Sequence, residues 1–224
     1  MKRTVVAGLA GVLAALAIGF WAHSALKKRE VGEAVVALVG DTSAQLREAL
    51  SLEALSSYAG TPDTVSRLER YARTTAERIV VLEGLEGWRD RELSDAARSY
   101  LSAAHQLLAN QVASHRHRSQ FSYSAETLRE HMAGASRRGD GWIEEALRRK
   151  QQVDRDYVEY RYSVENFGRL LSTYADTRSD AVARLGAPLV VDESLASEAR
   201  ERVIEAGRRA AAEMQKARQL AAPR

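Results

Sequence analysis

The first hydrophobic feature of the chain is a continuous apolar run over residues 4–22, which contains no charged side chain. Lys2 and Arg3 precede the run, and three consecutive basic residues follow it at positions 27–29. At about 1.5 Å per residue, a helix of this length reaches most of the way across a hydrocarbon layer of roughly 30 Å. The pattern therefore predicts one transmembrane helix, and we assign residues 1–29 to a membrane anchor with basic flanks.

A cleavable secretory signal is the alternative interpretation of the same segment. Such signals also combine a basic start, an apolar stretch and small residues such as Ala22, Ser24 and Ala25. We expect the anchor to be retained, because the run is longer than the usual h-region of about 7–15 residues and a block of cations follows it. The basic flanks are nearly balanced. Of the two orientations, we expect a single-pass protein of the cell inner membrane with residues 30–224 in the periplasm.

Beyond the anchor, the apolar residues follow helical spacing and predict an all-α fold. The chain has three prolines, and Ala, Leu, Glu and Arg recur without any run of alternating β-branched residues. A first helix is expected to continue from the anchor to about Tyr58, and residues 60–62 (Gly-Thr-Pro) then end it and begin the next helix. Near Gly84 and Gly87 the pattern permits either a break or a kink within one helix.

The strongest periodicity predicts one long helix from about Gly141 to Leu185, with Asp140 as its N-cap. A separate short helix from Ser124 to about Arg137 is expected before it. If straight, the long helix measures on the order of 65–70 Å. Steps of 4-3-4-3 define a seam that is typical of coiled coils and of long antiparallel bundles. The seam consists of Val153, Tyr157, Tyr160, Val164, Phe167, Leu171, Tyr174, Arg178, Ala181 and Leu185.

The remaining elements follow from the breaker residues after this helix. Residues 186–188 (Gly-Ala-Pro) are expected to stop it, and Asp192 or Ser194 begins a last helix rich in Ala, Glu and Arg. The sequence thus predicts an N-terminal transmembrane helix followed by an elongated antiparallel helical bundle with coiled-coil-like packing. This bundle domain extends over residues 30–224.

The distribution of charge argues against nucleic acid as a partner. The chain has 33 Lys and Arg against 30 Asp and Glu, but residues 1–29 contain five of the basic residues and no acidic one. The bundle domain is therefore slightly acidic, and the sequence pI of about 9.2 reflects the membrane flanks. Basic clusters near Arg137 and Arg148 have acidic neighbours and are typical of solvated helix faces. We expect no nucleic-acid partner.

The reactive side chains form no recognisable catalytic or metal-binding pattern. The chain has no Cys, which removes disulfides and thiolate ligands. His115 and His117 would point about 200° apart on a helix, and His105 and His131 have no partner that the sequence identifies. The motifs of phosphate-binding loops, serine hydrolases and zinc proteases are absent. We expect no enzyme activity, cofactor, metal or small-molecule substrate.

The aromatic residues of the seam are the candidates for a binding surface. Tyr157, Tyr160, Tyr162 and Tyr174 could line a ligand pocket between helices, and the candidate partner-binding residues are Tyr157, Tyr160, Tyr174 and Arg178. Filling of a wide bundle core is the favoured interpretation of the tyrosines. Arg178 is costly within a seam unless it pairs or reaches solvent.

These patterns lead to one leading hypothesis and two alternatives. The first is a non-enzymatic scaffold or interaction protein of the bacterial cell envelope, held by one anchor and contacting another envelope protein. The second is a ligand-sensing bundle that works with a separate signalling partner. The third is self-association through a partly exposed seam. An anchored helical hairpin resembles efflux adaptors and the sensing bundles of chemoreceptors in architecture, but neither the β-rich segments of adaptors nor the second span of chemoreceptors is predicted.

Overall fold

The molecule is an all-helical bundle in the part that the structure describes. The computed structural model describes residues 29–54, 62–85, 91–134, 141–186, 189 and 193–220. No β-strand occurs among these residues, so the all-α prediction is confirmed.

Five helices make up the described bundle. The N-terminal helix is described over residues 29–54 and continues without interruption through Gly40. The other four helices are α2 (Pro62–Gly84), α3 (Arg91–Ala133), α4 (Trp142–Leu185) and α5 (Glu193–Leu220).

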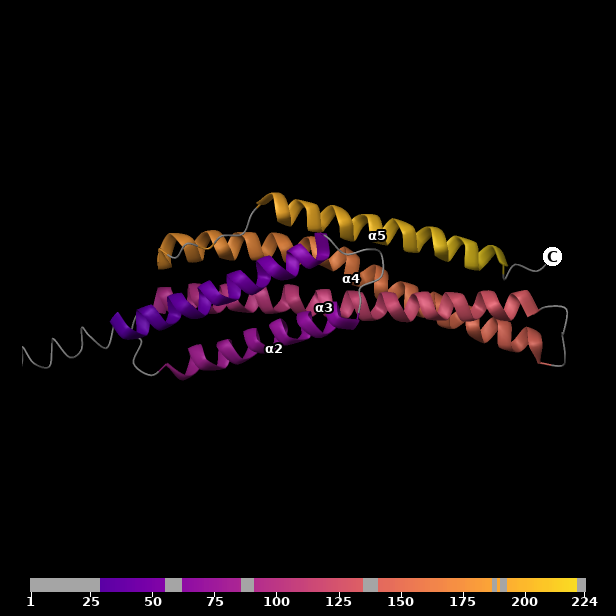
Figure 1. Cartoon of the computed structure of the whole chain (residues 1–224), viewed down its shortest axis with the longest axis horizontal. Coiled ribbons are helices and arrows are strands. Elements are labelled where there is room, and N and C mark those ends of the chain that lie inside the picture. Colours follow the sequence, from indigo (N-terminus) through magenta and orange to yellow (C-terminus); the bar gives the residue numbers. More distant parts are fainter. Residues whose placement is uncertain are drawn as a thin grey trace, which may run out of the picture.

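The helices α3 and α4 form an antiparallel hairpin along the whole length of the bundle (Figure 1). With 44 residues, α4 is about 65 Å long at roughly 1.5 Å per residue. The N-terminal helix and α2 cover the half in which α3 begins, and α5 covers the other half towards the α3–α4 connection. The described bundle is therefore a rod, with the start of the N-terminal helix at one end and the tip of the hairpin at the other.

Two clusters of buried side chains hold the rod together. The larger core joins all five helices and includes Leu46, Leu68, Leu107, Phe167 and Val203. Burial of each such side chain contributes roughly 1.5–3 kcal/mol. Towards the tip, a distal core joins α3, α4 and α5 alone. It consists of Phe121, Ala125, Leu128, Val153, Tyr160, Ala210, Met214 and Ala217.

The helix ends follow the predicted breaker residues. Pro62 is the first residue of α2, where its missing N–H leaves no hydrogen bond unmade. The helix α2 ends at Gly84 and α3 begins at Arg91, so two separate helices occur here in place of one kinked helix. Gly186 ends α4 with a φ of 61°, and its N–H donates to the carbonyl of Val182 at 3.1 Å. The predicted N-cap of α4 at position 140 lies outside the described residues.

One predicted boundary was wrong, because α3 continues through the segment that was expected to separate it from a short helix over Ser124 to about Arg137. The side chains of Phe121 and Leu128 are fully buried in the distal core. The hydroxyl of Ser124 donates to the carbonyl of Phe121 at 3.0 Å, which satisfies it inside a helix. Tertiary packing thus overrides the weak helix propensity of a serine-rich stretch.

The predicted seam of α4 is half right. Alternate seam residues, at seven-residue intervals from Val153 to Ala181, are buried as expected. Between them, a second row of buried positions consists of Asp156, Ser163 and Leu170, each one residue before the position that the seam predicted. This row faces α3, where the side-chain amide of Asn110 donates to the carbonyl of Ser163 at 3.0 Å. The remaining seam residues were expected to be buried and are only half-buried. They are Tyr157, Val164, Leu171, Arg178 and Leu185.

The chain's own helices cover the buried row of α4. Tyr174 packs in the larger core with side chains of the N-terminal helix and α3, and Val153 packs in the distal core with α5. Alternate positions of the predicted seam stay half-buried, so self-association through a partly exposed seam stays a prediction.

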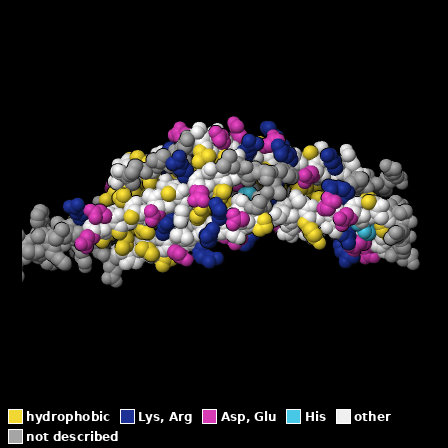
Figure 2. Space-filling view, viewed as in Figure 1, with side chains coloured by type: hydrophobic (Ala, Val, Ile, Leu, Met, Phe, Trp, Pro, Cys, Tyr) yellow, Lys and Arg dark blue, Asp and Glu magenta, His cyan; other side chains and the backbone are white. Residues whose placement is uncertain are grey.

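The surface of the rod mixes both signs of charge. Figure 2 shows Lys and Arg side chains beside Asp and Glu side chains along the whole of one face. Some pairs join neighbouring helices, such as Arg116 with Glu69 at 2.7 Å and Arg184 with Glu92 at 3.0 Å. Exposed pairs of this kind contribute at most about 1 kcal/mol each, so the buried cores dominate the stability of the fold.

The predicted membrane anchor lies outside the described residues, apart from Arg29 at its end. Among the helices that the structure describes, none combines the length and apolar composition needed to cross a bilayer. The anchor therefore stays a prediction from the sequence.

Candidate functional site

The four predicted site residues divide between two places in the bundle. Tyr157 and Tyr160 line a groove between α4 and α5, in the middle of the rod. Tyr174 lies in the larger core, and Arg178 lies one turn further along α4. The structure does not bring the four residues into one site.

Tyr174 is a core residue whose hydroxyl has a buried partner. Its side chain is 2% exposed, and its hydroxyl lies 3.1 Å from that of Tyr100 on α3. The two rings are tilted by 51°, with centroids 5.5 Å apart. Burial raises the pKa of Tyr174 far above its ordinary value and also raises the pKa of Tyr100. Both phenols therefore stay protonated and join α3 to α4 as neutral groups.

Arg178 has the ion-pair partner that a cation within the seam was expected to need. Its side chain is only 18% exposed, and Nη2 lies 3.3 Å from Oε1 of Glu193 at the start of α5. This contact bridges the end of α4 to the first turn of α5, where a carboxylate is also favoured by the helix dipole. Arg178 thus has a structural partner across the α4–α5 connection.

The groove between α4 and α5 has a volume of about 380 Å³. Its floor is apolar and comes from both helices, chiefly through Val164 and Phe167 of α4 and Val203 and Ile204 of α5. Phe167 and Val203 are almost fully buried, whereas Ile204 is 40% exposed. The groove is therefore an apolar trough that opens to solvent.

Two glycines line the contact between α4 and α5 at this groove, and one of them, Gly207, permits a close approach. A Cβ atom on Gly207 would lie 3.0 Å from Cγ1 of Val164, tighter than ordinary contact. On α4, a Cβ atom on Gly168 would lie 3.9 Å from Nε of Arg200. The guanidinium of Arg200 consequently reaches from α5 to the backbone of α4 at the rim of the groove.

The rim of the groove is basic. Arg161 on α4 is paired with Glu165 at 2.6 Å, so these two charges cancel locally. Arg200 and Arg208 on α5 also line the groove, and neither has a hydrogen bond or ion pair within the described part of the chain. Arg208 also borders a second depression that contains Glu198, Glu201 and Glu205 together with Arg202 and Arg209. Because Arg209 pairs with Glu205 at 3.0 Å, two glutamates remain there against Arg202, and Arg200 is the less compensated of the two groove cations.

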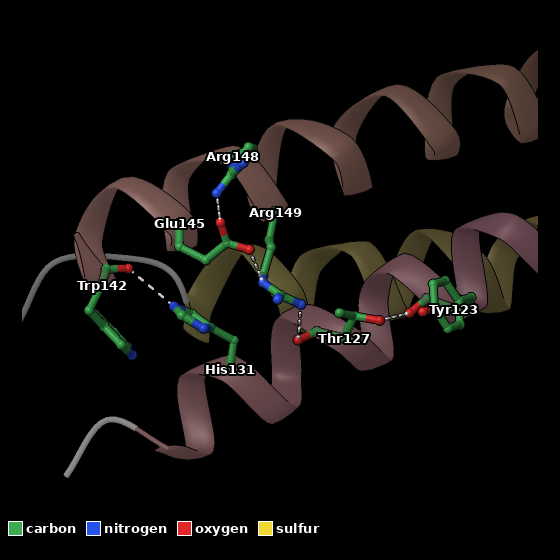
Figure 3. Close-up of polar contacts among 7 residues, drawn as sticks. All are labelled: Tyr123, Thr127, His131, Trp142, Glu145, Arg148 and Arg149. Atoms are coloured by element: carbon green, nitrogen blue, oxygen red, sulfur yellow. Dashed lines mark hydrogen bonds and ion pairs between the residues drawn. The ribbon is translucent and has the colours of Figure 1, made fainter. Parts of the chain in front are cut away.

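A second candidate surface lies at the tip of the α3–α4 hairpin (Figure 3). The ring of His131 on α3 stacks on Trp142 of α4 with centroids 5.0 Å apart, and its Nε2 lies 3.1 Å from the Trp142 carbonyl. Arg149 donates from Nε to Glu145 at 2.7 Å and from Nη1 to the carbonyl of Thr127. These contacts join the last turns of α3 to the first turns of α4 and fix the geometry of the tip.

Large apolar side chains are exposed on this fixed tip. Ile143 and Leu147 lie four residues apart on α4 and are 70% and 54% exposed, and Tyr123 on α3 is 75% exposed. The two side chains on α4 lie on the same side of the helix, because residues four apart are neighbours on a helix surface. Sequence analysis missed this pair, although apolar residues at i and i+4 outside the seam were the available signal.

The histidines serve structural contacts. His115 is buried, and its Nε2 lies 2.9 Å from Oε2 of Glu53 on the N-terminal helix. His105 approaches the carbonyl of Ala72 on α2 at 3.0 Å. Across the described residues, no group of three or more His, Asp or Glu side chains could hold a metal ion. The groove and the tip are the candidate binding surfaces of the described bundle.

Comparison of the chain with protein-family models, with curated proteins and with solved structures gives no match.

Proposed function

We propose that the protein is a single-pass, membrane-anchored helical scaffold of the bacterial cell envelope that contacts another envelope protein. The observation that supports this function most is the placement of an exposed apolar pair, Ile143 and Leu147, at the end of the rod remote from the N-terminal helix. An anchor over residues 4–22 would hold the opposite end at the bilayer. The rod would then present its tip at a distance set by the length of the hairpin.

The contacts beneath the tip favour a protein partner. Apolar side chains on a rigid base lose little conformational entropy on binding, which is the property of interface anchor residues. His131, Trp142 and Arg149 supply that base, because they tie α3 to the same first turns of α4 that carry the exposed pair. We place the partner-binding surface here rather than on Tyr174 or Arg178, whose contacts lie within the chain.

Site-specific photocrosslinking in intact cells tests this function. A photoreactive residue at position 147 is expected to give a crosslinked product of one defined mass, and Ile143→Glu with Leu147→Glu should abolish co-purification of the same partner. Val80 and Val81 on α2 are exposed to 68% and 52% and provide the matched control pair. If Val80→Glu with Val81→Glu abolished the interaction while the tip variant retained it, the tip would not be the docking surface.

The groove supports a second candidate function, a ligand-sensing bundle that works with a separate signalling partner. An apolar trough of about 380 Å³ lies within the range of roughly 300–1,000 Å³ that is usual for small-molecule sites. Tyr157 and Tyr160 line it, whereas Tyr162 and Tyr174, the other two tyrosines of the ligand-pocket alternative, do not. Stabilisation of the full chain by a fraction of cell metabolites, lost in Ile204→Glu, would support this function; equal stabilisation of both proteins would count against it.

A further inference from the structure

The α4–α5 groove combines an apolar floor with two cations, Arg200 and Arg208, that make no hydrogen bond or ion pair within the described residues. Its floor contains Phe167 and Val203, which are nearly inaccessible, and Ile204, which faces solvent. An apolar group laid on this floor would remove the exposed surface of Ile204 from water, a favourable change of about 25 cal/mol per Å². The floor therefore favours a ligand with an apolar group, but it does not determine the charge of that ligand.

The charged side chains around the groove determine which ligand charge it favours. They are Arg161, Glu165, Arg200 and Arg208. Glu165 is neutralised by Arg161 at 2.6 Å, so it offers no uncompensated anion to a ligand. Arg200 and Arg208 are two helical turns apart on α5, about 12 Å along the axis, and each is without a hydrogen bond or ion pair in the described residues. Planar guanidinium groups bind carboxylates and phosphates with two parallel hydrogen bonds.

The size of the groove restricts the kind of anion. An α-helix with its side chains is about 10–12 Å across, whereas the trough between α4 and α5 has a volume of only about 380 Å³. A small molecule fits this space, and a partner helix would lie above it without filling it. The close approach of the two helices at Gly207 and Val164 limits the depth from below.

We propose that the groove binds a small soluble amphipathic anion, with its apolar group on Phe167, Val203 and Ile204 and its carboxylate or phosphate on Arg200. Arg208 adds attraction from the other end of the groove, weakened by the acidic side chains of the depression that it also borders. The inference rests on the second candidate function and gives that function a ligand class.

Titration calorimetry of the full chain in lipid nanodiscs tests the assignment with 4-phenylbutyrate and its neutral isostere 4-phenylbutyramide. We expect saturable binding of the carboxylate to one site and binding of the amide at least about tenfold weaker. Arg200→Gln should weaken carboxylate binding about tenfold, and Arg208→Gln should weaken it less. Arg202 lies on the same helix outside the groove lining, so Arg202→Gln is the matched control and should bind as the wild type does.

The apolar half of the site has its own control. Ile204→Glu should abolish binding, whereas Val80→Glu, which places the same charge at an exposed apolar position of α2, should leave it unchanged. Equal binding of the acid and the amide, or unchanged binding in Arg200→Gln, would overturn the proposed ligand class and leave a sensing role open. If neither probe bound and no metabolite fraction stabilised the protein, the ligand class and the sensing function would both fail.

Discussion

The hydroxyls of Tyr100 and Tyr174 lie 3.1 Å apart inside the larger core, so removing either hydroxyl should lower the stability of the fold. Tyr174→Phe leaves the Tyr100 hydroxyl without this partner and should lower the free energy of unfolding by about 1–2 kcal/mol. Tyr100→Phe combined with Tyr174→Phe should cost less than the sum of the single changes, since both partners are then gone. Urea unfolding measures the effect. Tyr162→Phe, at a side chain that is 66% exposed, is the control; an equal loss there would contradict the argument.

The same pair predicts how stability depends on pH. Burial raises the pKa of both phenols above the unfolded value of about 10. A raised folded-state pKa means that the contribution is fully present below pH 10 and is lost as the pH rises further, because the unfolded chain releases protons that the folded chain retains. Denaturation between pH 9 and 11.5 should show a steeper loss of stability in the wild type than in the double phenylalanine variant. Identical slopes would exclude the pair as a source of alkaline sensitivity.

At the scale of helices, two glycines in the α4–α5 contact should respond differently to the same substitution. Alanine favours a helix interior over glycine by about 0.5–1 kcal/mol. At Gly168 a methyl group meets Nε of Arg200 at an ordinary 3.9 Å, so Gly168→Ala should stabilise the protein by about that amount. At Gly207 the methyl would meet Val164 at 3.0 Å, so Gly207→Ala should be less stable than Gly168→Ala. Thermal unfolding of the two variants compares them directly; the reverse order would mean that the helices are not in close contact.

The elements themselves could largely be predicted from the sequence, and the errors have physical causes. Proline at position 62 and glycines at 84 and 186 mark helix ends through backbone geometry that local sequence fixes. The second row of the α4 seam was misplaced because apolar periodicity favours Tyr157 and Val164 over Asp156 and Ser163. The polar side chains can lie deeper because α4 itself supplies their partners, the carbonyl of Tyr160 for the Ser163 hydroxyl and Gln152 for Asp156. Apolar periodicity takes no account of such hydrogen bonds.

At the scale of the whole molecule, the rod shape followed from the length of one helix, whereas the candidate sites did not. Gly207 lets α5 lie close to α4 beneath the groove, and Ile143 and Leu147 stay exposed at the start of α4. Both depend on which helices pack together, which a single sequence does not reveal. Of the four predicted site residues, Tyr157 and Tyr160 lie at a groove, and Tyr174 and Arg178 have internal contacts.

The central claim is that residues 4–22 hold this rod in a membrane. Alkaline carbonate extraction of cell membranes, followed by detection through a tag after Arg224, tests it most directly. The full-length chain should stay in the membrane pellet at its full mass. A matched variant with Leu13→Glu and Leu16→Glu should be released, because each acidic residue near the middle of a span costs about 2.5–3.5 kcal/mol. Release of the unaltered chain, or its recovery shortened by the N-terminal segment, would contradict the anchored-scaffold account.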